Sequence, residues 1–147
     1  MRAGLSLAAA LAGLLATSAA APAPVRMARA TGPFLPLSDA DQSHAESGCT
    51  CTFLVERGGF NVNLLQLSGR TLLSRTRAGL AICPISEAQF QAISGPVGSA
   101  RCGDRRITVR SGPAREVGDD QAASAATVTV TQGGRTRVLH GTWACAC

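Results

Sequence analysis

The chain contains no lysine and no tyrosine, and its aromatic content is only 3%. Its positive charge therefore comes from 14 arginines, set against 9 acidic residues. Proteins that bind nucleic acids usually combine clustered cations with aromatic rings that stack on the bases. Because aromatics are scarce and Trp143 is the only tryptophan, we expect no nucleic-acid partner. A solvated, mildly cationic surface is the favoured interpretation.

Long apolar runs are absent beyond the N-terminus, so we expect no membrane span in the mature chain. The N-terminus itself carries Arg2, an apolar run over residues 3–16, and the small residues Ser18-Ala19-Ala20. This order is typical of a secretory signal peptide, which we place at residues 1–20; a retained N-terminal anchor is the alternative. We therefore expect a periplasmic or secreted protein, in which disulfides can form.

Catalytic motifs are missing as well. The sequence has no Gly-x-Ser-x-Gly elbow, no His-Glu-x-x-His pair and no glycine loop of the phosphate-binding kind. Its two histidines, His44 and His140, lie far apart in the chain. We therefore expect no enzyme activity, no cofactor, and no catalytic or metal-binding residue.

Prolines and small residues dominate the segment 21–47, which we interpret as a flexible arm ahead of the domain. Phe34, Leu35 and Leu37 are the arm residues that could dock on the folded part. Residues 48–147 hold all six cysteines and are expected to form one disulfide-stapled β domain.

Two Gly-Gly pairs predict β-hairpins, because glycine tolerates the positive φ of tight hairpin turns. Around Gly58-Gly59, counting outward pairs Val55 with Val62 and Phe53 with Leu64 on an apolar face. Around Gly133-Gly134, counting outward predicts four pairs on the inner face: Val130 with Arg137, Val128 with Leu139, Ala126 with Gly141, and Ser124 with Trp143. The opposite face of this hairpin carries Thr127, Thr129, Thr131, Val138 and His140. We expect Trp143 to be a core residue rather than part of a binding surface.

Shorter elements are expected between the hairpins. Strands are predicted at residues 70–74, 79–83 and 105–110. A capping box of Ser86 and Gln89 predicts a short helix over 87–93, with Phe90 and Ile93 turned inward. The glycine-rich and small-residue segment 111–125 is expected to be a mobile loop.

The cysteines suggest how the fold is closed. Cys49 and Cys51 lie on one strand face, as do Cys145 and Cys147, so bonds between the two pairs are easier than bonds within them. Antiparallel terminal strands would give Cys49–Cys147 and Cys51–Cys145, whereas parallel strands would give Cys49–Cys145 and Cys51–Cys147; we favour the antiparallel scheme. In either scheme, the remaining pair is Cys83–Cys102. We predict an all-β fold with one short helix: a small antiparallel barrel, or a two-sheet sandwich.

The function that requires no feature beyond those described is that of a small structural or binding module of the cell envelope. Its partner would be an envelope protein or glycan, reached by exposed arginines or by residues 111–125. Two alternatives use the four terminal cysteines, as thiolate ligands for Zn or Cu or as a thiol–disulfide exchanger. In size, expected compartment and strand-rich class, the chain also resembles periplasmic inhibitors of C-type lysozyme. That resemblance implies binding to a lysozyme and transfers no site residue, and the basic charge disfavours it because lysozymes are usually basic.

Overall fold

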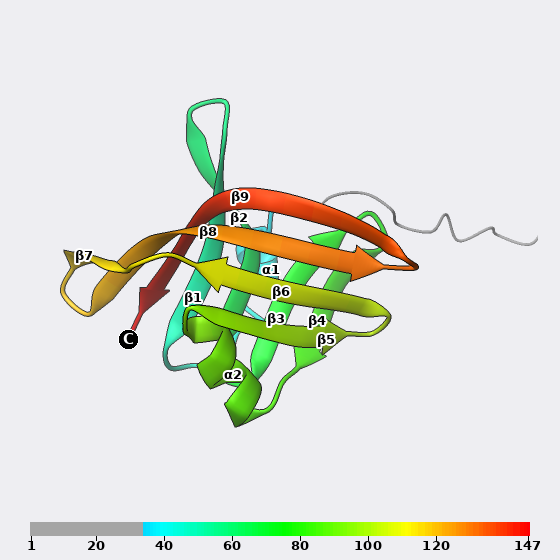
Figure 1. Cartoon of the computed structure of the whole chain (residues 1–147), viewed down its shortest axis with the longest axis horizontal. Coiled ribbons are helices and arrows are strands. Elements are labelled where there is room, and N and C mark those ends of the chain that lie inside the picture. The colour runs from blue at the N-terminus through cyan, green and yellow to red at the C-terminus, as the bar shows by residue number, and fades with distance from the viewer. Residues whose placement is uncertain (1–33) are drawn as a thin grey trace, which may run out of the picture.

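A computed structural model describes residues 34–147, so the expected signal peptide at 1–20 and the first part of the expected arm lie outside the described residues. Its strands form one antiparallel sheet in the order β4-β3-β2-β1-β9-β8-β6-β5, with β7 attached to β8. The sheet curls into a nearly closed barrel (Figure 1). The predicted all-β barrel is therefore confirmed, and the two-sheet sandwich is not formed.

Short hairpin turns connect most of the strands. The elements of the first half are α1 (Asp39–Gln42), β1 (Thr50–Arg57), β2 (Phe60–Ser68), β3 (Thr71–Thr76), β4 (Gly79–Pro84) and α2 (Glu87–Ser94). Those of the second half are β5 (Val97–Cys102), β6 (Arg105–Ser111), β7 (Arg115–Gly118), β8 (Gln121–Gln132) and β9 (Arg135–Ala146).

The first and last strands are antiparallel neighbours, with Cys51 opposite Cys145. The structure joins Cys49 to Cys147 and Cys51 to Cys145, with Cα atoms 4.2 and 4.0 Å apart. This is the pairing expected for antiparallel terminal strands. All four predicted inner-face pairs of the β8–β9 hairpin are also present, from Val130–Arg137 to Ser124–Trp143.

The β1–β2 hairpin agrees with the prediction near its turn and departs from it further on. Val55 is opposite Val62, as expected, but Phe53 is opposite Leu65 rather than Leu64. A β-bulge between Phe53 and Leu54 shifts the register by one residue. The bulge leaves Leu64 without a partner on β1, and both Leu64 and Leu65 are fully buried. The predicted Phe53–Leu64 pair is therefore wrong.

Helix α2 connects the two edge strands of the sheet, β4 and β5, and packs against β5. It begins at the predicted capping box, in which Ser86 and Gln89 bond each other's backbone, and it is capped by Gly95. Ile93 is fully buried and Phe90 packs against the core, as expected. The seam between the two edge strands is tied by a disulfide between Cys83 on β4 and Cys102 on β5, whose Cα atoms are 5.3 Å apart.

The described part of the segment 21–47 packs onto the barrel instead of forming an arm. Phe34 is only 3% exposed, and Leu37 is buried as well. The backbone N–H groups of Leu35 and Leu37 donate to Arg75 and Asn63, each at 2.8 Å. For residues 34–47 the prediction of a flexible arm is therefore wrong, whereas the docking considered for Phe34, Leu35 and Leu37 is observed. Local composition gave no measure of the backbone partners that the barrel offers. We call this segment the N-terminal strap.

The prediction of a mobile loop over residues 111–125 is also wrong. Strand β7 and the first five residues of β8 occupy most of it, with Arg115 opposite Ala123. Alanine has little intrinsic preference for strands, but β9 and β7 both pair with this part of β8. Pairing with these neighbours outweighs the local preference.

The core fills the barrel and includes Phe53, Ile107 and Val128, all fully buried. Trp143, opposite Phe53 on the neighbouring strand, is 2% exposed, so its predicted core position is confirmed. Within residues 34–147, no helix is long and apolar enough to cross a membrane.

Candidate functional site

The outer side of β5, β6, β8 and β9 presents an ordered array of arginine and hydroxyl side chains. These four strands lie side by side across the front of the molecule in Figure 1. Their outward residues form three rows that cross the strands. The rows are Val97–Arg110–Thr127–His140, Ser99–Thr108–Thr129–Val138 and Arg101–Arg106–Thr131–Thr136. We call this surface the arginine–threonine face.

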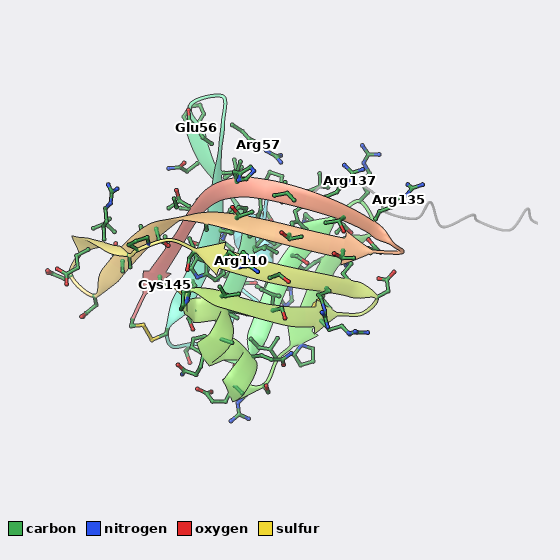
Figure 2. All side chains as sticks on the ribbon, viewed as in Figure 1. Glu56, Arg57, Arg110, Arg135, Arg137 and Cys145 are labelled. Atoms are coloured by element: carbon green, nitrogen blue, oxygen red, sulfur yellow. A yellow bond between two sulfur atoms is a disulfide. The ribbon has the colours of Figure 1, made fainter. Side chains whose placement is uncertain are left out.

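The face follows from strand alternation. Every second residue of each strand points outward, and the intervening residues Ile107, Val109 and Val128 are fully buried in the core. The buried positions thus determine which side chains share the outer surface. Figure 2 shows Arg110 on this front wall of the barrel.

No acidic residue occupies any of the three rows. The nearest acid in sequence is Asp104, in the turn between β5 and β6. Both oxygens of its carboxylate accept hydrogen bonds from the Gln132 amide, at 3.0 and 3.1 Å. Among the residues that the structure describes, the one ion pair joins Arg75 to Asp41, in the N-terminal strap. The guanidinium groups of the face are therefore not neutralised by carboxylates of the described chain.

Arg101 and Arg106 face each other directly across β5 and β6, and both are exposed. Directly opposed like charges destabilise a sheet. An anion placed between the two guanidinium groups would reverse that repulsion, because each guanidinium offers several N–H donors to one carboxylate or phosphate. This end of the face is thus suited to holding a negatively charged group.

At the other end of the face, a shallow open hollow of about 360 Å³ lies beside Arg110, Thr127 and His140. Small residues line the rest of it: Ser111, Gly112, Ala125, Ala126 and Gly141. The Thr127 hydroxyl and His140 Nδ1 are 3.3 Å apart, which fixes the two side chains relative to each other. A ligand group in this hollow would meet one guanidinium, one imidazole and one hydroxyl.

A second exposed feature is the tip of the β1–β2 hairpin, which extends beyond the sheet (Figure 1). β1 pairs with β9 only as far as Leu54, so the remaining residues up to Arg57 have β2 as their single neighbour in the sheet. Phe60 at this tip is 76% exposed and lies opposite Arg57. The sequence did not reveal this projection, because the separation of β1 from β9 depends on the tertiary structure.

The four cysteines near the ends of the β domain form two disulfide bonds and are not available as a set of metal ligands. Within residues 34–147 all six are paired, and none is free. Metal coordination by these cysteines requires thiolates, and a sulfur in a disulfide does not supply one. His140 is on the outer face of β9, whereas Cys51 is buried in the core.

The perturbed carboxyl groups lie in the N-terminal strap, away from the arginine–threonine face. Hydrogen bonds from the Arg75 guanidinium and then from the Ser38 backbone N–H hold the pKa of Asp41 well below its usual range. The Arg70 backbone N–H and the Thr71 hydroxyl likewise lower the pKa of Glu46. These groups fasten the strap to β3 and to the turn between β2 and β3.

Comparison with protein-family models, with curated proteins and with solved structures finds no match for this chain. Of the residues of this face, the sequence had placed Thr127, Thr129, Thr131 and His140 on one strand face. It had left Arg101, Arg106 and Arg110 unassigned. The alternation of residues 105–110 was visible, but β5 was not predicted, so the Arg101–Arg106 pair could not be found.

Proposed function

We propose that this protein is an exported, non-catalytic binding module of the cell envelope, and that it recognises an acidic partner through the arginine–threonine face. The observation that carries the proposal is the set of exposed arginines on one sheet face with no carboxylate among them. A dense cationic face attracts anionic ligands, and directed guanidinium groups then hold carboxylates or phosphates.

Export is supported by the signal-peptide features of residues 1–20 and by three disulfides, because such bonds persist in oxidising compartments. A rigid sheet also suits binding, since the backbone of paired strands loses little further freedom when a ligand arrives.

The test is retention of the purified, oxidised protein on a carboxylated matrix compared with an uncharged matrix of the same polymer. We expect retention on the carboxylated matrix that falls as salt screens the charges. The double variant Arg101→Thr/Arg106→Thr should elute at clearly lower salt than the unmodified protein.

The matched control is Arg57→Thr/Arg77→Thr, which removes the same charge from two exposed residues outside the face. If the two double variants elute together, retention reflects net charge alone and the proposal is wrong. Equal retention of the unmodified protein on both matrices would also refute it.

A further inference from the structure

The arginine–threonine face contains two groups of cationic donors at opposite ends. One is the Arg101–Arg106 pair, and the other is the Arg110–Thr127–His140 group beside the hollow. Arg106 and Arg110 lie on the same face of β6, four residues apart. At about 3.3 Å per residue, their Cα atoms are separated by roughly 13 Å. A small anion held between Arg101 and Arg106 therefore lies beyond the reach of the Thr127 and His140 side chains at the other end of the face.

Between the two donor groups lies a row of hydroxyls. Ser99, Thr108 and Thr129 occupy adjacent strands in register, and Thr108 is directly opposite Thr129. Hydroxyls both donate and accept hydrogen bonds, so this row matches a ligand that carries hydroxyl groups between its charges. A purely anionic chain would leave these donors and acceptors to water.

Phenylalanine, tyrosine and tryptophan are absent from all three rows of the face, and His140 is the one aromatic ring among their residues. Single-stranded nucleic acids are held largely by bases stacking on such rings, so the face offers little to them. Sugar rings bearing carboxylate or sulfate groups need guanidinium and hydroxyl partners, and both are present. The small residues around the hollow, including Gly112 and Ala125, let a chain approach the sheet closely.

We infer that the arginine–threonine face binds a linear acidic glycan, whose charged groups occupy the Arg101–Arg106 pair and the Arg110–Thr127–His140 group while its hydroxyls contact the row of Ser99, Thr108 and Thr129. This inference deepens the proposed function and rests on it. It adds a ligand class and a minimum ligand length, since the chain must reach across both donor groups.

The test is a calorimetric titration of the oxidised protein with oligogalacturonates of increasing length. Joining two binding events on one chain raises affinity by about 100-fold or more once both sites are reached. We therefore expect weak binding by short oligomers and a steep rise in affinity at the length that spans the face. The variant Arg101→Thr/Arg106→Thr should remove that rise, because only the Arg110–Thr127–His140 group then remains to bind the oligomer. The control Arg57→Thr/Arg77→Thr should keep it.

A second comparison identifies the chemical class. Thr108→Val/Thr129→Val removes two hydroxyls and changes side-chain shape little, so the loss of their hydrogen bonds should weaken oligogalacturonate binding about tenfold. It should leave polyphosphate binding unchanged. Equal or tighter binding of polyphosphate or single-stranded DNA by the unmodified protein would overturn the glycan inference. Folding of each variant is checked by its thermal unfolding transition.

The outcomes also separate this inference from the proposed function. Binding that depends on Arg101 and Arg106 but not on oligomer length would overturn the two-group glycan site and leave the acidic-partner function standing. Absence of binding to every anionic probe, together with no retention on the carboxylated matrix, would remove both.

Discussion

Individual arginines have two different roles in this protein. Arg75 is half-buried and donates to both oxygens of Asp41, and this contact anchors the N-terminal strap. Arg101 and Arg106 are exposed, and neither is ion-paired within residues 34–147. The first kind stabilises the fold in a way that depends on one carboxylate. The second kind has no carboxylate partner among the described residues, which is the basis of the proposed binding to an acidic ligand.

The strap contacts predict a dependence of stability on pH. The pKa values of Asp41 and Glu46 are lowered on folding, from ordinary values of 3.8 and 4.5. The unfolded chain therefore binds these protons more readily than the folded one, so the stabilisation is complete above the ordinary values and is lost as the pH falls below them. We expect the melting temperature to fall between about pH 5 and about pH 2.

The variant Asp41→Asn/Glu46→Gln should be less stable at neutral pH and should show a flatter dependence of melting temperature on pH over the same interval. The control Glu116→Gln removes an exposed carboxyl on β7 and should follow the unmodified protein. A melting temperature in the unmodified protein that rises on acidification would show that the strap carboxyls do not act as described.

Among the elements, helix α2 depends on the absence of a side chain at Gly98. A Cβ atom at this position of β5 would overlap the backbone of Ala92 and Ile93 in the helix. Gly98→Ala should therefore push the helix away from the sheet and disturb the burial of Ile93. We expect a loss of about 1–3 kcal/mol in the free energy of unfolding, measured by urea denaturation.

Gly112→Ala is the matched control for that substitution. Here the added Cβ would lie 3.5 Å from the Ala125 carbonyl oxygen, which is an ordinary contact. We expect a change near zero, or a slight stabilisation because alanine restricts the unfolded chain. Equal losses in the two variants would mean that the packing of α2 does not depend on Gly98.

Elements differed in how well local sequence predicted them. The β8–β9 hairpin and α2 were predicted because turn glycines, alternation and a capping box all lie within a few residues of the structure they specify. The register of β1 with β2 was missed beyond Leu54, since the alternation of neither strand indicates the bulge that leaves Leu64 without a partner. The sequences of β5 and β7 showed no alternation that we recognised as a strand. Both segments become strands by pairing with β6 and β8, respectively.

For the whole molecule, the disulfides close the barrel at two places. Cys49–Cys147 and Cys51–Cys145 join the terminal strands, which also pair through their backbones, whereas Cys83–Cys102 crosses the seam between β4 and β5. By sequence separation, the terminal bonds span 98 and 94 residues and the seam bond spans 19. If loop length alone decided the contribution of each bond, the terminal bonds would stabilise the fold more than the seam bond.

We predict the opposite order for the loss in free energy of unfolding when one disulfide is removed at a time. Without Cys49–Cys147, the Cys51–Cys145 bond still closes nearly the same loop, so Cys49→Ser/Cys147→Ser should lower the free energy of unfolding by only about 2 kcal/mol. Cys83→Ser/Cys102→Ser has no such substitute and should cost about 3 kcal/mol. Guanidinium denaturation of the two double variants compares them, and a larger loss from Cys49→Ser/Cys147→Ser would contradict this account of closure.

The sequence by itself determined the strand-rich class, the turns, the helix cap and the cysteine pattern, because each of these is set by chemistry within a few residues or by the geometry of one strand face. Only the tertiary structure decided the arginine–threonine face. Arg101, Arg106 and His140 belong to three different strands, and their alignment depends on how β5, β6, β8 and β9 pair around the barrel. The docking of residues 34–47 and the closure of the seam were likewise decided by surfaces that exist only once distant strands have come together.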